Sequence, residues 1–474
     1  MDFFKKTASQ KAPPPSDRFT DKIHINATML EEAFSKPMDL QTKFFSTESK
    51  QYCLVFLKTI IKKDLLDARI ISPLIQDENL DVMNLPLPDI QKQPSKKQVI
   101  EGISDAKIAL FQEGDSNCYL IEASDFLQRA VTEPTTEQVI YGSHEGFIEG
   151  LEGNINLLRK RLKTEHFQIK SMTIGDNPST KLAYCYIDNK VDNKILKIVE
   201  ERLQSIEIHI PLTVGTLQNY LDDNIYSPFP QLMITEKPSR AAEYISEGAI
   251  ALIVDGSSSV FLMPVTFFAF YHAPDDRLNR IYVGTFKQLL RLLGIMVSLS
   301  LPAFYIALVS FYYEIIPIDL VADVKGSLEN IPFPPLIEAF LMQIILELLR
   351  EAAVRLPNSI AQTIGVVGGL VIGTAIVEAN LVSNTMLIVI AITAISSFVI
   401  PNQEMGITIR LLSFPLMVLA YMFGLLGIFL GLMIILFHLC KLDSLGRPYF
   451  EPIAPFSLKN TIRTFINLPV KKEN

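Results

Sequence analysis

Hydrophobic and polar positions are distributed differently in the two halves of this 474-residue chain. Residues 1–286 alternate charged and apolar positions at ordinary spacing, whereas from about Leu289 onward long uncharged runs dominate. An apolar run of about 20 residues is long enough to cross a bilayer as a helix. The pattern therefore predicts a soluble N-terminal part followed by an all-α, membrane-embedded part.

Three uncharged regions of the second half are long enough to supply membrane spans. They are Leu292–Tyr313, the paired segments Ser359–Val377 and Val382–Ile400, and Leu411–Cys440. Together they predict about four transmembrane helices. The last region would measure about 45 Å as one helix, so we expect it to tilt, kink or project from the bilayer.

A further apolar segment, Phe333–Arg355, differs from these regions because it carries five charges. They are Glu338, Glu347, Arg350, Glu351 and Arg355. A charge at the centre of a span costs about 2.5–3.5 kcal/mol, while each Leu or Ile returns only about 0.3–0.6 kcal/mol. We therefore expect an amphipathic or re-entrant helix that packs against the spans.

The distribution of basic residues supports an even number of spans. Basic residues precede the first span and recur after the last one, and such residues favour the cytoplasmic side. Four spans place both termini in the cytoplasm, whereas five would place the basic C-terminal tail outside. The N-terminus lacks the apolar core of a signal peptide, which also predicts a cytoplasmic soluble part.

Glycines recur at intervals of four in two of the predicted spans. Each glycine inside a helix costs about 1 kcal/mol relative to alanine, yet small residues let helix backbones approach closely in lipid. The pattern has two interpretations, which are packing among the helices of one chain and contact between identical chains or with a partner subunit. The candidate positions are Gly365, Gly369, Gly373, Gly427 and Gly431.

The charged helix also has two interpretations. Glu347–Arg350 and Glu351–Arg355 have the spacing of helical salt bridges, whereas ionisable residues at membrane depth also line water-filled paths. Glu338 lies about 180° around the helix from Glu347, so it needs a different environment. Glu338, Glu347, Arg350 and Glu351 are the candidates for a pore or gate.

The soluble part alternates strand and helix patterns, which predicts α/β layers. KLAYCYID is a buried strand, NKILKIVEERLQSI an amphipathic helix, and AIALIVDGSSSVFLMPVTF a hairpin turning at Asp255–Gly256. We predict a polar flexible tail over residues 1–45, subdomains at 46–141 and 142–286, a membrane domain at 287–440 and a C-terminal tail at 441–474.

Composition argues against several classes of function. The net charge is −8 and no basic stripe stands out, which argues against nucleic-acid binding. Four scattered cysteines form neither a disulfide framework nor a metal site, which favours a reducing compartment. Phosphate-loop, HExxH and GxSxG motifs are missing from the sequence. We expect no enzymatic activity, no cofactor and no metal.

Several stretches resemble the A subunits of GerA-type spore germinant receptors of endospore-forming bacteria. They sample much of residues 142–456 in the family's order and include EGFIEGLEGNINLLRKRL, FPQLMITEKPSRAAEYISEG, IPFPPLIEAFLMQIILELLREAAVRLP, IGVVGGLVIGTAIVEANLVS and SLGRPYFEPIAPF. One departure is visible in YGSHEGF, where Tyr141 and His144 stand at positions at which the family usually has arginine.

The resemblance implies a cytoplasmic α/β domain of two subdomains ahead of a membrane domain in the spore inner membrane. It also implies a complex with a transporter-like B subunit that senses the nutrient and a lipoprotein C subunit. A subunits of this kind are proposed to form homo-oligomeric, nutrient-gated ion channels that start cation release. The alternatives are a membrane-anchored signalling scaffold and a secondary transporter, the latter disfavoured because no internal repeat is evident.

Overall fold

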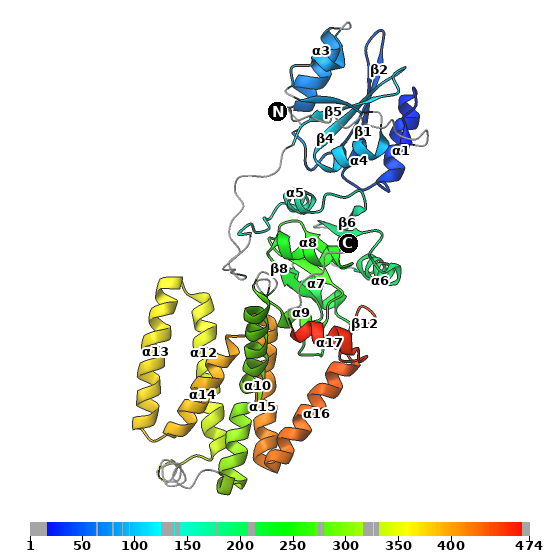
Figure 1. Cartoon of the computed structure of the whole chain (residues 1–474). Coiled ribbons are helices and arrows are strands. Elements are labelled where there is room, and N and C mark those ends of the chain that lie inside the picture. Colours follow the sequence, from blue (N-terminus) through cyan, green and yellow to red (C-terminus); the bar gives the residue numbers. More distant parts are fainter. Residues whose placement is uncertain are drawn as a thin grey trace, which may run out of the picture. The chain divides into compact units, whose positions relative to one another are not determined.

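The computed structural model separates into two compact units (Figure 1). Unit 1 comprises the chain up to Asp222 together with Leu232–Pro264, and unit 2 comprises Asp223–Gln231 together with the chain from Val265 onward. The structure describes residues 17–62, 65–77, 80–87, 89–93, 95–124, 137, 143–175, 179–206, 214–273, 276, 279–315, 326 and 331–466.

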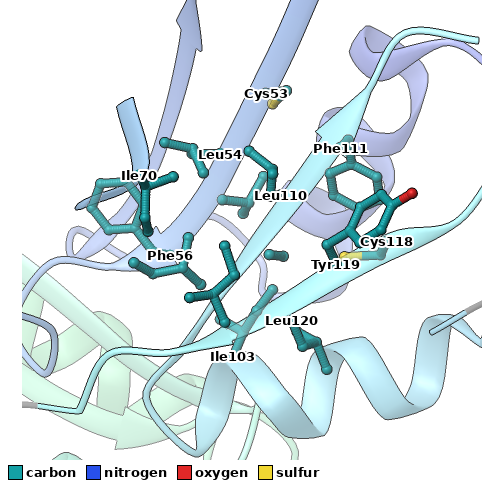
Figure 2. Packing of buried hydrophobic residues seen from close by; sticks show 14 of the residues in the cluster. Cys53, Leu54, Phe56, Ile70, Ile103, Leu110, Phe111, Cys118, Tyr119 and Leu120 are labelled. Carbon is teal, nitrogen blue, oxygen red and sulfur yellow. The ribbon is translucent and has the colours of Figure 1, made fainter. Parts of the chain in front are cut away.

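The first sheet of unit 1 has five strands in the order β1-β2-β4-β5-β3, with every described pairing antiparallel. Its strands are β1 (Leu40–Ser46), β2 (Gln51–Leu57), β3 (Ile90–Gln93), β4 (Lys107–Gln112) and β5 (Cys118–Glu122). The accompanying helices are α1 (Ile23–Ala33), η2 (Leu66–Ile71), α3 (Ser72–Gln76), η3 (Val82–Asn84) and α4 (Lys96–Ser104). Figure 2 shows the buried side chains of the central strands, among them Leu54, Leu110 and Leu120, gathered with Ile103 of α4.

The structure differs from the predicted tail over residues 1–45, because α1 and most of β1 lie inside that stretch. Helix α1 buries Ile23, Ala27 and Leu30 on one face. Strand β1 is at the edge of the sheet and leaves alternate positions exposed. A short helix and a half-polar edge strand give only weak hydrophobic patterns, which is why the stretch resembles a tail in sequence.

The second sheet of unit 1 is also antiparallel and has the order β6-β7-β9-β10-β8. Its strands are β6 (Phe167–Ile174), β7 (Thr180–Ile187), β8 (Met233–Thr235), β9 (Ile250–Val254) and β10 (Val260–Met263). Its helices are α5 (Leu151–Arg161), α6 (Asn193–Gln204), α7 (Val214–Leu221) and α8 (Pro238–Ser246). The hairpin predicted at Asp255–Gly256 is confirmed, and Gly256 has φ +86°, a conformation that favours glycine.

Side chains and backbone groups join the two sheets inside unit 1. Arg159 of α5 forms a two-pronged pair with Asp39, with Nε–Oδ2 and Nη2–Oδ1 distances of 3.0 and 2.8 Å. Both side chains are at most 1% exposed. The Met38 amide donates to the Ile169 carbonyl at 3.0 Å, and Gln168 Nε2 donates to the Phe34 carbonyl at 2.7 Å. A buried charge pair and ordinary hydrogen bonds therefore connect the two subdomains.

Helices dominate unit 2. They are α9 (Phe267–Tyr271), α10 (Ile281–Phe311), η5 (Tyr313–Ile315), α12 (Pro335–Arg355), α13 (Asn358–Glu378), α14 (Asn384–Ser397), α15 (Gln403–Phe423), α16 (Leu425–Lys441) and α17 (Leu458–Phe465), with the short strands β11 (Asp443–Ser444) and β12 (Arg447–Pro448) between the last two. By length and composition, α10 and α15 are able to cross a membrane. Because α14, α16 and Gly368–Glu378 are shorter apolar helices, the predicted count of about four spans is not confirmed.

The predicted span Leu411–Cys440, which we expected to tilt, kink or project, is not one continuous helix, because the chain reverses at Gly424. Helix α15 ends at Phe423 and α16 begins at Leu425, with Gly424 at φ +61° and ψ −141°. A Cβ on Gly427 would lie 2.0 Å from the Leu419 carbonyl oxygen, so the two helices form a close antiparallel hairpin. The sequence is apolar on both sides of the break, so hydropathy alone does not reveal it.

Candidate functional site

An ion-pair cluster lies where α12, α14 and α15 meet in unit 2. One oxygen of Glu347, Oε1, accepts hydrogen bonds from Arg350 Nη1 at 2.6 Å and from Arg410 Nε at 2.7 Å. Arg350 also donates from Nη2 to Ser397 Oγ at 2.9 Å, and its guanidinium lies 5.1 Å from the centre of the Phe398 ring. A single carboxylate therefore balances two guanidinium groups from different helices.

A small cavity lies beside this cluster. Its volume is about 20 Å³, which is enough for about one water molecule. The cavity is too small for an amino acid or a sugar, so it is not a pocket for an organic nutrient. It is lined by Gln343, Leu346, Glu347, Arg350, Ile390, Thr393, Ala394 and Arg410.

Two further polar contacts lie along α12, toward its N-terminus. About one turn from Glu347, Ser413 of α15 donates to Gln343 Oε1 at 3.1 Å in a buried position. Glu338 is fully buried, and its Oε2 accepts from the Ser383 amide at 2.8 Å. Its other oxygen, Oε1, has no hydrogen-bond partner within the described part of the chain.

Glu338 caps α14 by accepting a hydrogen bond from the Ser383 amide. The Ser383 side chain caps the same helix by accepting from the Met386 amide at 3.1 Å. A carboxylate is favourable there because the first amides of a helix are unpaired and its N-terminus carries a partial positive charge. Nine residues separate Glu338 from Glu347, which is about 14 Å along a helix. The polar groups of α12 therefore lie at separate levels of an apolar helical unit.

The structure distributes the four candidate charges among three environments. Glu347 and Arg350 lie together, Glu338 lies at the start of α14, and Glu351 is on the surface. Glu351 pairs with Arg355, and their side chains are 64% and 76% exposed. Sequence reasoning missed Arg410, which directly precedes an apolar run and therefore resembles the charged boundary of a span.

The candidate glycines also divide into two sets. A Cβ on Gly427 or Gly431 would approach Leu419 O or Leu416 Cδ1 within 2.0 and 2.4 Å, so these two glycines serve packing inside the chain. A Cβ on any glycine of the α13 ridge would meet nothing within 4 Å in the described structure. The ridge consists of Gly365, Gly369 and Gly373.

A linking segment, Asp223–Gln231, is packed in unit 2 although the chain on both sides of it belongs to unit 1. Thr408 of α15 donates to the Pro228 carbonyl at 2.5 Å. Ser227 Oγ lies 2.9 Å from His438 Nε2 at the end of α16. Because Thr408 is two residues from Arg410, the linking segment contacts the same helix as the ion-pair cluster. No pattern in the sequence indicates this packing.

More contacts hold the end of the linking segment. Tyr449 Oη donates to the Pro230 carbonyl at 2.6 Å and Ser444 Oγ donates to the Gln231 carbonyl at 2.9 Å. These two bonds, like the one from Thr408, are to backbone carbonyl groups, so they fix the path of the chain, whereas Ser227 is held through its side chain. In the described residues, no group of three or more His, Cys, Asp or Glu side chains is arranged to hold a metal ion.

These features define a two-part protein. One part consists of two antiparallel α/β layers, and the other is an apolar helical unit that contains the ion-pair cluster and is suited to a membrane. Residues 28–474 match the family model described as Bacillus/Clostridium GerA spore germination protein. The chain therefore belongs to this family, and the resemblance seen in the sequence is confirmed.

Curated relatives match the chain over nearly its full length. Spore germination protein A1 of Bacillus subtilis (strain 168) is 37% identical over 462 residues, which cover 96% of this chain and 95% of that protein. The uncharacterized membrane protein YfkQ of the same organism is 35% identical over 479 residues, which cover 99% and 92%.

A solved structure matches part of the chain. It is the crystal structure of the N-terminal domain of the A subunit of the Bacillus megaterium spore germinant receptor GerK3. The match covers 53% of this chain and 97% of that chain, at 19% identity and a TM-score of 0.40.

Proposed function

We propose that this chain is the A subunit of a nutrient-responsive spore germinant receptor and is embedded in the spore inner membrane. Family membership and relatives named as spore germination proteins support the receptor role. The two helices long and apolar enough to span a membrane support the location. By the same proposal, a transporter-like B subunit and a lipoprotein C subunit complete the receptor.

Unit 2 contributes to a gated ion path in this proposal. The observation that carries it is the position of Glu347 between Arg350 and Arg410 beside a cavity of about 20 Å³. Ionisable side chains inside apolar helical units pair with one another or line paths for ions and water. A cavity with room for about one water suits ion or proton passage better than nutrient binding.

Association of identical chains completes the path, and α13 supplies the contact surface. Within the described residues, a Cβ on any of the three glycines of its ridge would meet nothing within 4 Å, whereas small residues in lipid commonly mark places where helices approach one another. The native mass of the purified full chain in mild detergent tests this step. A homo-oligomer that Gly369→Leu disperses supports it, and a monomer, or an oligomer unaffected by Gly369→Leu, contradicts it.

Ion release from spores tests the ion path. Spores carrying Glu347→Gln are compared with spores carrying Glu351→Gln, a matched change one turn further along α12 on an exposed pair. We expect Glu347→Gln to change ion release after a nutrient mixture while the protein level and native mass stay normal, and Glu351→Gln to have little effect. Equal release in both strains would leave the cluster with a structural role only.

A second candidate function is a signalling subunit whose helices transmit a conformational change without conducting ions. The linking segment favours it, because the chain passes between the units at Asp223, Leu232 and Val265 and is bonded to α15 and α16. Under this alternative, Thr408→Val weakens the nutrient response while Glu347→Gln leaves it unchanged. Thr374→Val is the control, because Thr374 bonds only within its own exposed helix in the described contacts.

A further inference from the structure

Helix α17 has an exposed apolar stripe beside two basic residues. Leu458 and Ile462 are spaced by four and are 64% and 43% exposed, and Ile466, the extended residue that directly follows the helix, is 38% exposed. Lys459 and Arg463 are also exposed, and each lies about 100° further around the helix than the apolar residue that it follows. The apolar side and the basic side of α17 are therefore adjacent, and both are open.

Thr464 and Phe465 attach α17 to the rest of unit 2, and Phe465 lies within about 20° of Leu458 around the helix. Thr464 is buried, and the Phe465 ring lies 5.7 Å from the ring of Phe268 and 6.0 Å from that of Tyr271, both in α9. Asn460 lies about 160° around the helix from Ile462 and is exposed. Asn460 and the buried Thr464 are four residues apart, so both lie on the side of α17 opposite Ile462, and Asn460 is the exposed one of the two.

Contacts between α9 and α10 fix the level at which α17 lies. Tyr271 Oη donates to the Gln288 carbonyl at 2.5 Å, and Arg291 Nη1 donates to the Tyr271 carbonyl at 2.8 Å. Arg291 also pairs with Asp276 at 2.6 Å. The uncharged run of α10 begins at the next residue, Leu292. Because Phe465 of α17 contacts Tyr271, which Arg291 binds, α17 lies near the border between the charged and the apolar part of α10.

We propose that α17 is an interfacial anchor that lies along the membrane surface and binds acidic phospholipids. The proposal rests on the membrane location proposed above. Leu458 and Ile462 enter the upper part of the acyl-chain layer, while Lys459 and Arg463 pair with headgroup phosphates. A helix with one apolar side and basic flanks is the usual form of such a membrane-surface element.

Two features favour a lipid surface over a protein partner. The helix follows α16 closely in the chain and lies at the level where α10 becomes uncharged, so a bilayer around α10 would meet the apolar stripe of α17. The two basic residues match the negative surface of a membrane that contains acidic lipid, where each contributes about a fivefold increase in partitioning. The opposite side presents Asn460, a neutral polar residue suited to water.

The test places an environment-sensitive fluorophore at single positions of the full chain in vesicles. Cys440→Ser removes the exposed thiol among the four cysteines. The other three are buried, and burial raises the pKa of Cys53 to about 12 and the pKa values of Cys118 and Cys185 well above their usual range. Labels at Ile462→Cys and Leu458→Cys report on the apolar stripe, and a label at Asn460→Cys is the matched control.

Vesicles contain equal amounts of phosphatidylcholine and phosphatidylglycerol, with a lipid-borne quencher in the upper acyl chains. We expect quenching at Ile462→Cys and Leu458→Cys to be several-fold stronger than at Asn460→Cys. Quenching at these two positions should weaken several-fold in vesicles of pure phosphatidylcholine. Combining Lys459→Gln with Arg463→Gln should weaken the quenching to the same extent. Equal quenching at Ile462→Cys and Asn460→Cys, or no dependence on acidic lipid, overturns the proposal.

A label at Phe429→Cys separates this proposal from the membrane location on which it rests. Phe429 is in α16 and is 62% exposed. Quenching there without quenching at the α17 stripe means that the chain is embedded and the anchor is wrong. If Phe429→Cys is not quenched either, the membrane location itself fails. An apolar signal at Ile462→Cys that lipid quenchers do not reduce means that a protein surface covers the stripe, which also overturns the anchor.

Discussion

Glu347 and Arg410 are 63 residues apart in the chain, yet Arg410 Nε donates to Glu347 Oε1 over 2.7 Å. The same oxygen accepts from Arg350 one helical turn away. One carboxylate oxygen therefore connects a turn of α12 to α15. This contact is the centre of the candidate site and the easiest part of it to test.

Removing the charge of Glu347 should destabilise unit 2. Glu347→Gln leaves Arg350 and Arg410 close together without their shared carboxylate. Hydrogen bonds to charged groups contribute about 1.5–3 kcal/mol. Because the Glu347 side chain is 38% exposed, solvent screening reduces this contribution, and we expect the free energy of unfolding to fall by about 1–2 kcal/mol. Thermal unfolding of the full chain in detergent measures it.

A double-mutant cycle with Arg410→Gln isolates the pair. The loss in the double variant should be smaller than the sum of the two single losses. Glu351→Gln is the control, because its partner Arg355 is on the surface and exposed pairs contribute about 0–1 kcal/mol. Additive effects, or a Glu351→Gln loss as large as that of Glu347→Gln, would contradict a coupled cluster.

The hairpin of α15 and α16 should not tolerate a side chain at Gly427. A Cβ there would lie 2.0 Å from the backbone oxygen of Leu419, which has no freedom to rotate away. Overpacking of this kind costs about 1–3 kcal/mol, so we expect Gly427→Ala to lower the thermal midpoint clearly.

Gly369→Ala is the matched change on the open ridge of α13. Among the described residues its Cβ would meet nothing within 4 Å, and alanine gains about 1 kcal/mol of helix propensity over glycine. We expect unchanged or higher stability of the single chain. A midpoint for Gly427→Ala as high as that for Gly369→Ala would mean that the two helices of the hairpin do not approach closely.

Local chemistry made much of the fold predictable. Gly256 marks the β9–β10 turn because few other residues adopt its positive φ. The long charged helix α12 follows from its spacing and from the cost of inserting its charges. In contrast, the strand order of each sheet depends on contacts between distant residues. One sequence carries little information about such contacts.

The candidate site was only half predictable for the same reason. Glu347 and Arg350 are one turn apart, so helical spacing pairs them, but Arg410 comes from another helix, 63 residues from Glu347 in the chain, and spacing along one helix cannot predict that contact. The linking segment was also missed. Its bonds use the backbone carbonyls of Pro228, Pro230 and Gln231, and a carbonyl group has no sequence signature.

The buried pair of Asp39 and Arg159 should dominate the contact between the two sheets of unit 1. Both side chains are at most 1% exposed, and removing one partner of such a pair costs about 3–5 kcal/mol because it leaves a buried charge uncompensated. We expect Asp39→Asn to lower the free energy of unfolding of unit 1 by this amount. Hydrogen exchange should show it first in α5 and at the start of β1.

Asp105→Asn is the control for this prediction. Asp105 pairs with Lys163 at 2.8 Å, but both side chains are about half exposed, so its loss should stay below about 1 kcal/mol. If Asp39→Asn and Asp105→Asn gave similar losses, the Asp39–Arg159 pair would not be the main link between the sheets.

Glu145 should make unit 1 less stable in acid. Lys160 Nζ donates to its Oε1 at 2.8 Å and Arg161 pairs with its other oxygen. The hydrogen bond from Lys160, helped by Arg161, lowers the pKa of Glu145 below the ordinary 4.5. The folded state therefore holds this proton less tightly than the unfolded state. The resulting stability is complete above pH 4.5 and is lost as the pH falls through the folded-state pKa.

Unfolding curves of the full chain across this pH range check the sign of the effect. We expect wild type to exceed Glu145→Gln in stability at neutral pH, with the difference shrinking as the pH falls below 4.5, because both then carry a neutral side chain at this position. Glu152→Gln, an exposed change in the first turn of α5, should run parallel to wild type. A difference between wild type and Glu145→Gln that stays constant with pH would show that the charge of Glu145 contributes nothing to folding, and that its contacts with Lys160 and Arg161 act only by packing.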